Sequence, residues 1–388
     1  MNAVKRILNV LLILLGVMLI AVCADLMSNK LGNTDFESLN EIDRGAIEEI
    51  CRMTALFDDK YGNEEIWTED YNLKKEACVI TRKYGLLKGY TYAVNMSAPK
   101  CLYAQRITMP EDYSDIPVYR FSYFMPFTFS LANSEEGGYT RVRGRQVYAS
   151  PFDAQTVKYN GTGSLEEEYV RETFAHSVES ADVPEIDESK HFKLEEENVA
   201  LTGLQYRILD DMMGASSKEQ LNELIAEYVL VREYQSEKYP EFAVRREQTE
   251  LEYGTERYVF YNISDLIDHN ITYFNKEAAD SITFYSAYYY LCTGRYNSDI
   301  SEFLDQTGDE YMGAALCSIL NDNELSANWQ TKLSGKPGSG FTSQYTLLKN
   351  YCGGTCSEYS DKTIDDIKKT YNYDEITSMA KTLIEGVS

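Results

Sequence analysis

The chain has 388 residues, with 62 acidic against 37 basic side chains and a formal net charge of −25 at pH 7. So acidic a chain repels phosphate backbones, and we therefore expect no nucleic-acid partner. Eight cysteines are too few for a small disulfide scaffold, so apolar packing has to stabilise the fold. The length is sufficient for two domains.

The first predicted element is an apolar segment near the N-terminus. From Ile7 to Cys23, 17 residues are interrupted only by Asn9 and Gly16, and a Lys-Arg pair precedes them. A secretory signal has about 7–15 such residues and a membrane-spanning helix about 18–20, so this length falls between the two. The basic pair favours the cytoplasmic side, which places residues 25–388 outside the cytoplasm.

Three fates stay open for this segment, residues 1–24. We favour a retained single-pass anchor, because the length and the charged flanks are closest to those of a membrane span. A signal cleaved after Ala24, which would leave a secreted protein, is the alternative. Lipidation at Cys23 is the least favoured, because a lipobox requires a small residue where Val22 stands.

Residues 25–182 are predicted to form a β-rich domain with flanking helices and an antiparallel sheet. Apolar residues at helical spacing predict a first helix over 36–61, ended by Gly62. Ser164 begins a capping-box pattern that predicts a helix at the other end of the domain. Between the two helices the period of two predicts a hairpin and three further strands, over 75–84, 89–96, 102–110, 118–131 and 140–150.

The strongest strand signal is an alternation of apolar and polar residues. Aromatic or apolar side chains occupy every odd position from Tyr119 to Leu131, which predicts a strand with one buried face. Pro126 removes one backbone donor, so this strand either bulges or lies at a sheet edge. We interpret the aromatic stripe as core, with a sugar-stacking surface as the alternative. The 32 tyrosines of the chain are interpreted in the same way.

The second half of the chain is predicted to be mainly helical. An acidic linker over 183–193 leads into a helical domain over 194–388, so the fold class is α+β. A helix over 194–213 ends at Gly214, and Ser216 is expected to cap a second helix that completes a helical hairpin. One short strand is expected over 255–263. Further helices are predicted near 277–292, 309–320, 342–351 and 374–385.

The leading candidate binding site is a row of three arginines. Arg141, Arg143 and Arg145 alternate along the predicted strand over 140–150, so all three would project from one face. Guanidinium groups bind carboxylates and phosphates bidentately, and this row locally reverses the negative charge of the chain. The competing interpretation is that the arginines pair with the protein's own acidic side chains on a solvated face.

The cysteines are interpreted as candidates for disulfides. Cys78 and Cys101 fall in neighbouring predicted strands and can pair, while either Cys352 or Cys356 can meet Cys317 or Cys292. The three residues between Cys352 and Cys356 fit neither a zinc ribbon nor a redox motif with two. An odd number of exported cysteines leaves one thiol unpaired or bridged to another molecule.

Other motifs argue against most catalytic chemistry. Glu172, His176 and Glu179 are spaced as half a metal site, but a second half is missing, so no metal is predicted. The glycine-rich loop over 335–340 has the spacing of a phosphate loop, yet Phe341 stands where its lysine must be. A nucleophile elbow is also missing, so we predict neither catalytic residues nor a cofactor.

Two functions of different classes follow. We favour a non-catalytic binding or interaction module of the cell envelope, attached to the membrane through the N-terminal segment. Its partner would be a surface protein or a small anionic ligand. The alternative is an extracytoplasmic hydrolase that uses carboxylates or an isolated cysteine. A purely structural envelope protein is a third possibility.

Overall fold

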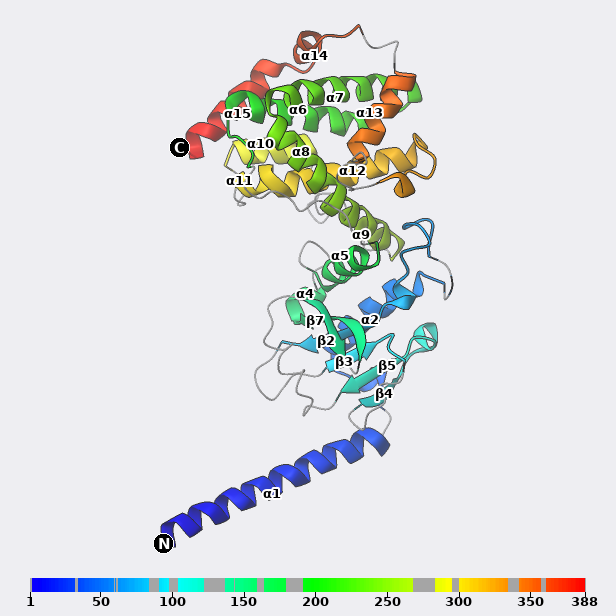
Figure 1. Cartoon of the computed structure of the whole chain (residues 1–388), viewed down its shortest axis with the longest axis vertical. Coiled ribbons are helices and arrows are strands. Elements are labelled where there is room, and N and C mark those ends of the chain that lie inside the picture. Colours follow the sequence, from blue (N-terminus) through cyan, green and yellow to red (C-terminus); the bar gives the residue numbers. More distant parts are fainter. Residues whose placement is uncertain are drawn as a thin grey trace. The chain divides into compact units, whose positions relative to one another are not determined.

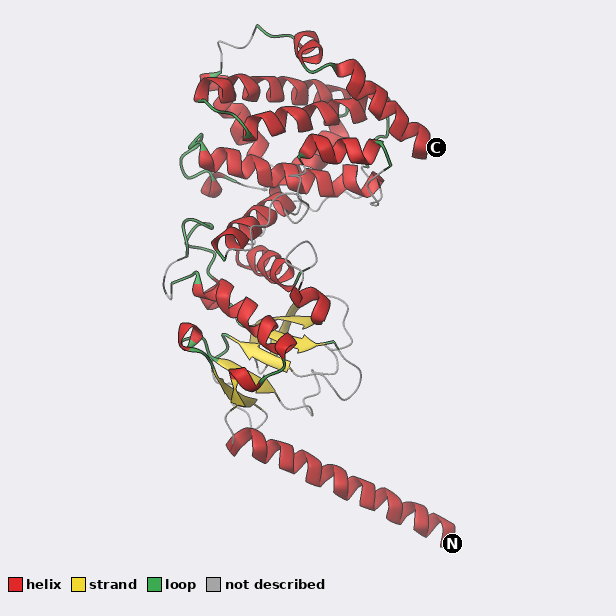
Figure 2. Cartoon of the chain, turned by 180° about the vertical axis from the view of Figure 1, so that it is seen from behind, coloured by secondary structure: helices red, strands yellow, loops and turns green. Residues whose placement is uncertain are grey.

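A computed structural model gives the fold of the chain (Figure 1). Contacts divide it into two units, Met1–Ser177 and Val178–Ser388, and each is described by itself. The first combines a sheet with helices, and the second is helical (Figure 2). The described residues are 2–31, 34–58, 60, 62–83, 91–97, 104–121, 137–142, 144–158, 164–178, 191–267, 283–294, 300–333, 342–356 and 361–387.

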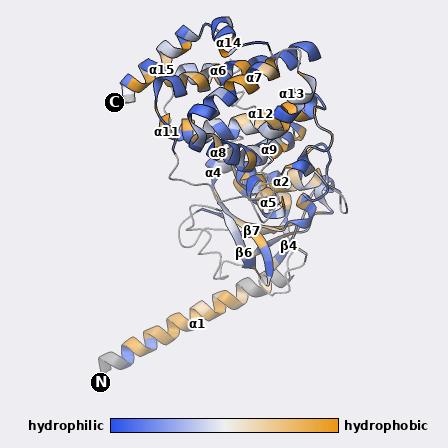
Figure 3. Cartoon of the chain, turned by 45° about the horizontal axis from the view of Figure 1, so that its top comes forward, coloured by the Kyte–Doolittle hydropathy of each residue, from blue (hydrophilic) through white to orange (hydrophobic). Residues whose placement is uncertain are grey.

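The N-terminal segment forms one long helix, α1 (Asn2–Leu31). Its stretch from Lys5 to Ala24 comprises 20 residues with a mean hydropathy of 2.9, and none of it is buried (Figure 3). At 1.5 Å per residue, 20 residues span about 30 Å, the thickness of a bilayer core. The predicted apolar element is therefore present, and it is long and apolar enough to be a signal or an anchor.

The first unit contains a seven-stranded sheet in the order β1-β4-β5-β3-β2-β7-β6. The predicted hairpin, formed by β2 and β3, and the strand at β4 are confirmed. The strands are β1 (Thr34–Asp35), β2 (Cys78–Arg82), β3 (Thr91–Val94), β4 (Ala104–Thr108), β5 (Val118–Phe121), β6 (Gly138–Val142) and β7 (Arg145–Phe152). The helical elements are η1 (Phe36–Ser38), α2 (Glu41–Ala55), η2 (Leu73–Lys75), η3 (Glu111–Tyr113), α4 (Ala154–Lys158) and α5 (Leu165–Val178).

The sheet is mixed, so the prediction of an antiparallel sheet is wrong in part, although the α+β class is confirmed. β7 pairs with β2 in parallel, and β1 pairs with β4 in parallel. β7 reaches β2 only after the chain has formed β3, β4 and β5 on the other side of β2. The central strand β2 is buried along nearly its whole length, as is usual for strands with a parallel neighbour.

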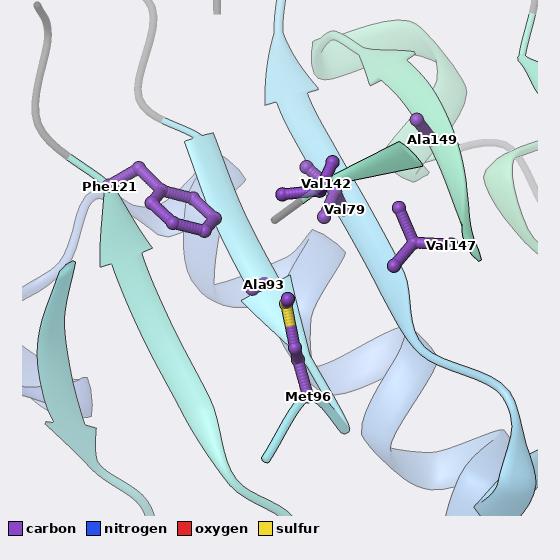
Figure 4. Close-up of a cluster of buried hydrophobic side chains, with 7 residues drawn as sticks. All are labelled: Val79, Ala93, Met96, Phe121, Val142, Val147 and Ala149. Atoms are coloured by element: carbon purple, nitrogen blue, oxygen red, sulfur yellow. The ribbon is translucent and has the colours of Figure 1, made fainter. Parts of the chain in front are cut away.

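One face of the sheet carries an apolar cluster drawn from five strands (Figure 4). Tyr119 and Phe121 of the predicted aromatic stripe pack in or against this cluster, which confirms the core interpretation for these two residues. The rest of the stripe, 122–131, lies outside the described residues. The cluster consists of Val79, Ala93, Met96, Phe121, Val142, Val147 and Ala149.

Helices α2 and α5 both cover the opposite face of the sheet. Asp43 of α2 is buried and accepts hydrogen bonds from the Tyr92 hydroxyl at 2.7 Å and from Arg82 Nε at 2.6 Å. Tyr169 of α5 packs on Tyr148 of β7, with their ring centroids 5.7 Å apart. The predicted helix start is also confirmed, because the Ser164 hydroxyl accepts from the backbone N–H of Glu167.

The helical unit is built on a hairpin of α6 (Glu196–Met213) and α7 (Lys218–Lys238). The hairpin was predicted correctly, but its second helix is capped by Ser217, not Ser216. The other elements are α8 (Pro240–Thr249), η4 (Glu250–Gly254), α9 (Thr255–Leu266), α10 (Phe284–Cys292), α11 (Ile300–Glu302), η5 (Phe303–Thr307), α12 (Gly308–Asp322), η6 (Gln330–Lys332), α13 (Gln344–Thr355), α14 (Ile364–Thr370) and α15 (Tyr373–Val387).

The prediction of a strand over 255–263 is wrong, because these residues lie in α9. The chain passes from α8 through the π-helical turn η4 into α9 without leaving helical backbone angles. Where η4 crosses α12, a side chain at Gly313 would place its Cβ 2.5 Å from the Glu250 carbonyl oxygen. The crossing therefore depends on glycine, and it brings Glu250 into the core of the unit.

Buried tyrosines are a common feature of both units. Their burial supports the interpretation of the tyrosine-rich composition as core filling. Seven tyrosines of the described residues are almost completely inaccessible: Tyr71, Tyr92, Tyr148, Tyr169, Tyr206, Tyr228 and Tyr288.

Candidate functional site

The predicted arginine row does not lie on one strand. Arg141 is on β6 and Arg145 begins β7, with a turn through Gly144, whose φ is +81°. Arg141 pairs with Gln146, and Arg145 with Val142, so the two exposed arginines point to opposite faces of the sheet. The strand predicted over 140–150 is therefore wrong. Arg143 lies outside the described residues, and binding by these arginines stays a prediction.

A half-buried polar cluster lies on the same sheet face as Arg141. Glu76 precedes β2, Tyr139 belongs to the edge strand β6, and His176 and Ser177 lie in the last turn of α5. The Tyr139 hydroxyl donates to Glu76 Oε2 at 3.1 Å, and the Ser177 hydroxyl donates to Oε1 at 3.3 Å. The Tyr139 and His176 rings are in contact, with centroids 3.9 Å apart and their planes tilted by 32°. We call these four residues the Glu76 cluster.

Buried tyrosines form the base of the Glu76 cluster. Burial and the nearby Glu76 carboxylate raise the pKa of Tyr139, so its hydroxyl stays protonated and donates. The hydroxyl of Tyr169 is fully buried and has no hydrogen-bond partner among the described residues. Burial raises the pKa of Tyr169 well above its usual value, and the neighbouring Cys78 and Tyr71 add to the rise. The cluster thus combines one carboxylate with neutral hydroxyl groups.

The geometry of the Glu76 cluster suits binding better than hydrolysis. In a catalytic triad the histidine accepts a hydrogen bond from the nucleophilic hydroxyl. Here Ser177 donates to Glu76, while His176 stacks on Tyr139. A carboxylate offers about four acceptor positions, and the two hydrogen bonds to Glu76 leave acceptor capacity for a further donor. The Tyr139 and His176 rings lie beside it.

The cysteines of the described residues carry thiols, without a disulfide among them. Cys78 and Cys317 are fully buried, in β2 and α12, and Cys101 lies outside the described residues. Cys352 and Cys356 lie in and next to the last turn of α13. Burial raises the pKa of the Cys317 thiol to about 12, and Gln344 Nε2 donates to its sulfur at 3.5 Å. Pairing through disulfides stays a prediction.

No cluster of metal-ligating side chains was found within the part of the chain that the structure describes. His176, one of the three residues spaced as half a metal site, packs on the Tyr139 ring instead. Glu179 and the glycine-rich loop over 335–340 lie outside the described residues. The predictions of no metal and no cofactor stay predictions.

The helical unit contains a second candidate, a network of buried ion pairs. Arg232 donates to both carboxylate oxygens of Glu250, at 2.5 and 2.7 Å, and its guanidinium group lies 4.1 Å from the centre of the Tyr345 ring. Arg246 Nε donates to Asp309 Oδ1 at 2.8 Å. All four charged side chains are at most 2% exposed. We call Arg232, Glu250, Arg246 and Asp309 the buried ion network.

Neutral amides connect the buried ion network to the α6–α7 hairpin. Arg246 Nη1 donates to Gln205 Oε1 at 3.0 Å and to Gln235 Oε1 at 2.8 Å. Gln235 in turn donates to Asn198 Oδ1 at 2.9 Å. With every charge paired and hidden from solvent, we assign this network to helix packing rather than to catalysis.

Both candidates were missed at the level of sequence. The residues of the Glu76 cluster come from segments about 100 positions apart, since Ser177 and Glu76 are separated by 101 residues. Of the four residues of the Glu76 cluster, the sequence singled out His176, through its spacing with Glu172 and Glu179. No protein-family model, curated protein or solved structure matches this chain.

Proposed function

We propose that the protein is a non-catalytic binding module, attached to a membrane by α1, with residues 25–388 on the extracytoplasmic side. The observation that carries the proposal is α1 itself, with a 20-residue stretch of mean hydropathy 2.9 that is not buried by any of the described residues. An uncovered apolar helix of this length is unfavourable in water and favourable in a bilayer. The Lys5-Arg6 pair at its start favours the cytoplasmic side.

The Glu76 cluster is the proposed contact surface. The Glu76 carboxylate can accept a further hydrogen bond, and the Tyr139 and His176 rings lie beside it. Carboxylates beside aromatic rings suit the ammonium or guanidinium group of a basic side chain. We therefore propose a protein partner that presents a basic side chain, and Arg141 on the same face would meet an acidic group of that partner.

The hydrolase alternative has less support. A catalytic cysteine needs a lowered pKa, whereas burial raises the pKa of Cys292 and Cys317 to about 12 and also raises that of Cys352. The buried carboxylates Glu250 and Asp309 are neutralised by arginines and hidden from substrate. Neither kind of group is prepared for attack on a substrate.

A topology experiment tests the proposal. An epitope fused after Ser388 is expected to be removed by protease added to intact cells with a permeable outer envelope, and the protein is expected to require detergent for extraction. Replacing Lys5 and Arg6 by glutamate serves as a matched control and should reduce this accessibility. An epitope protected in intact cells would overturn the proposal. Aqueous extraction with a new N-terminus at Asp25 would replace the anchor by a cleaved signal.

The contact surface is tested separately by photo-crosslinking in cells. A photoreactive amino acid at Arg141 is expected to give an adduct of higher mass, and Glu76→Gln in the same chain should weaken it. The matched control position is Glu385 on α15, which is 70% exposed and far from the cluster in sequence. Equal adducts from both positions would refute a specific surface at the Glu76 cluster.

A further inference from the structure

Two cysteines meet at the C-terminal end of α13. The backbone N–H of Cys356 donates to the carbonyl oxygen of Cys352 at 2.8 Å, which closes the last turn of the helix. Cys352 is half-buried and Cys356 is 2% exposed. The side chain of Cys356 opposes the rise that burial causes in the pKa of Cys352. The two cysteines are therefore neighbours on one turn of the helix.

The distance between these cysteines is compatible with a disulfide. Residues four apart in a helix have Cα atoms about 6 Å apart, within the range of about 4.4–6.8 Å for disulfides. Their Cβ atoms lie about 5–6 Å apart and must approach to about 4 Å. Gly353 and Gly354 lie between them, and no atom lies within 4 Å of a Cβ built on either. Glycine adopts a wider range of backbone angles than other residues, so the turn between the two cysteines can adjust.

We infer that Cys352 and Cys356 form a reversible disulfide within one helical turn. The thiolate of Cys352 attacks a low-molecular-weight disulfide and releases one thiol, forming a mixed disulfide. The thiolate of Cys356 then attacks the sulfur of Cys352 and releases the second thiol. Both cysteine protons go to solvent, so the donor disulfide is reduced to two thiols as the cysteine pair is oxidised.

Partial access to solvent distinguishes Cys352 from the buried cysteines. Cys51, Cys78 and Cys317 have 0% exposure, and burial raises the pKa of each thiol. Thiolates are the attacking species, so these three cysteines are expected to react slowly. Cys352 combines partial exposure with a second cysteine one helical turn away. A bridge to Cys317, one of the two partners suggested by sequence, would instead have to replace the Gln344–Cys317 contact.

The proposed disulfide has a structural consequence. Because the Cβ atoms must move together, the oxidised turn is strained, and strained disulfides are reduced more easily than structural ones. Tyr351 is adjacent to the pair, and its hydroxyl donates to Asn222 Oδ1 of α7 at 2.9 Å. Oxidation is therefore expected to alter the contact between α13 and α7, so the pair would act as a redox-sensitive element of the helical unit.

Peptide mapping of the purified full chain in detergent tests the inference. The protein is equilibrated with mixtures of oxidised and reduced glutathione, remaining thiols are alkylated, and trypsin is added. Cleavage after Lys349 and Lys362 yields one peptide, 350–362, that contains both cysteines and no other. We expect this peptide to become two hydrogen masses lighter and unalkylated under oxidising mixtures, and to revert with reduced glutathione. The measurement uses added glutathione, so its outcome is independent of the proposed topology.

The variant Cys356→Ser separates the two steps. Glutathione is expected to accumulate on Cys352 in this variant, because the second thiol that displaces it is missing, whereas Cys292→Ser should behave as the unchanged chain. Circular dichroism checks folding, and the mapping of the unchanged chain decides the question if the variant does not fold. Full alkylation under oxidising mixtures, a stable glutathione adduct on the unchanged chain, or a crosslink to the Cys317 peptide would each overturn the inference.

Discussion

Replacing Glu250 by glutamine is expected to destabilise the helical unit strongly. Glu250 is 0% exposed and Arg232 is 2% exposed, so water cannot replace the lost charge. The glutamine carbonyl oxygen can accept from one guanidinium nitrogen, but its amide group cannot accept from the other. The change therefore leaves a buried guanidinium group with one neutral acceptor in place of a carboxylate.

The magnitude follows from the two hydrogen bonds of 2.5 and 2.7 Å. Each hydrogen bond to a charged group contributes about 1.5–3 kcal/mol, and removing one partner of a buried ion pair costs about 3–5 kcal/mol. The cation–π contact of Arg232 with Tyr345 remains and offsets only a small part of this loss. We expect the free energy of unfolding of the helical unit to fall by about 3–5 kcal/mol.

The two tryptophans of the chain allow each unit to be followed separately. Trp67 is buried in the first unit, and Trp329 is buried in the helical unit. In a Trp67→Phe background, tryptophan fluorescence during urea unfolding reports on the helical unit alone. In a Trp329→Phe background it reports on the first unit, where Glu250→Gln should leave the unfolding midpoint unchanged.

Two further variants test whether the unpaired buried charge causes the loss of stability in Glu250→Gln. Glu385→Gln removes the same charge from an ion pair in which both side chains are more than 60% exposed, and it should change stability by less than about 0.5 kcal/mol. The double variant Arg232→Met/Glu250→Leu removes both buried charges and should recover most of the loss. A loss below about 1 kcal/mol for Glu250→Gln would refute the reasoning, as would a double variant no more stable than the single one.

Three further outcomes are expected. The seven buried tyrosines have raised pKa values, that of Tyr228 to about 12. Above about pH 10 the unfolded chain therefore releases protons that the folded chain keeps, and the free energy of unfolding falls as the pH rises further. The final part of the tyrosinate absorbance, from the buried tyrosines among the 32 of the chain, should rise together with loss of helical circular dichroism. Complete titration of all tyrosines in a chain that keeps its helical signal would contradict this. Gly313→Ala should lower the unfolding free energy reported by Trp329 fluorescence by about 1–3 kcal/mol. Gly353→Ala, where a new methyl group would meet no other atom, should be neutral or stabilising. Ser217→Ala should cost about 1 kcal/mol and Ser216→Ala less, because Ser217 accepts from the backbone of Gln220; equal costs would contradict the assigned cap.

Local patterns predicted the elements whose stabilising contacts are near in sequence. The α6–α7 hairpin was predicted from apolar spacing together with Gly214, which does end α6. The turn between β6 and β7 was missed, because a single glycine inside an alternating stretch also fits a continuous strand. Gly144 adopts a positive φ there, and this backbone angle is a property of the turn that the alternation of side chains does not encode.

The strand predicted over 255–263 failed for a related reason. Apolar residues at Tyr258, Val259, Phe260 and Ile263 fit neither a period of two nor a period of 3.6 clearly, and the segment is buried nearly all round. The π-helical turn η4 continues directly into α9. We therefore attribute the helical conformation of residues 255–263 to tertiary packing against α12. The partners in the buried ion network are 18 and 63 residues apart, so no local pattern could have paired them.

The buried ion network also bears on the proposed attachment to a membrane. Its two arginines and two carboxylates cancel one another, so the excess of acidic over basic residues lies outside this network. A chain with a net charge of −25 is repelled by anionic lipid headgroups. Attraction to a bilayer therefore has to come from apolar transfer, which α1 supplies through the exposed side chains between Lys5 and Ala24. Among the described residues, the proposed attachment to a membrane therefore relies on α1.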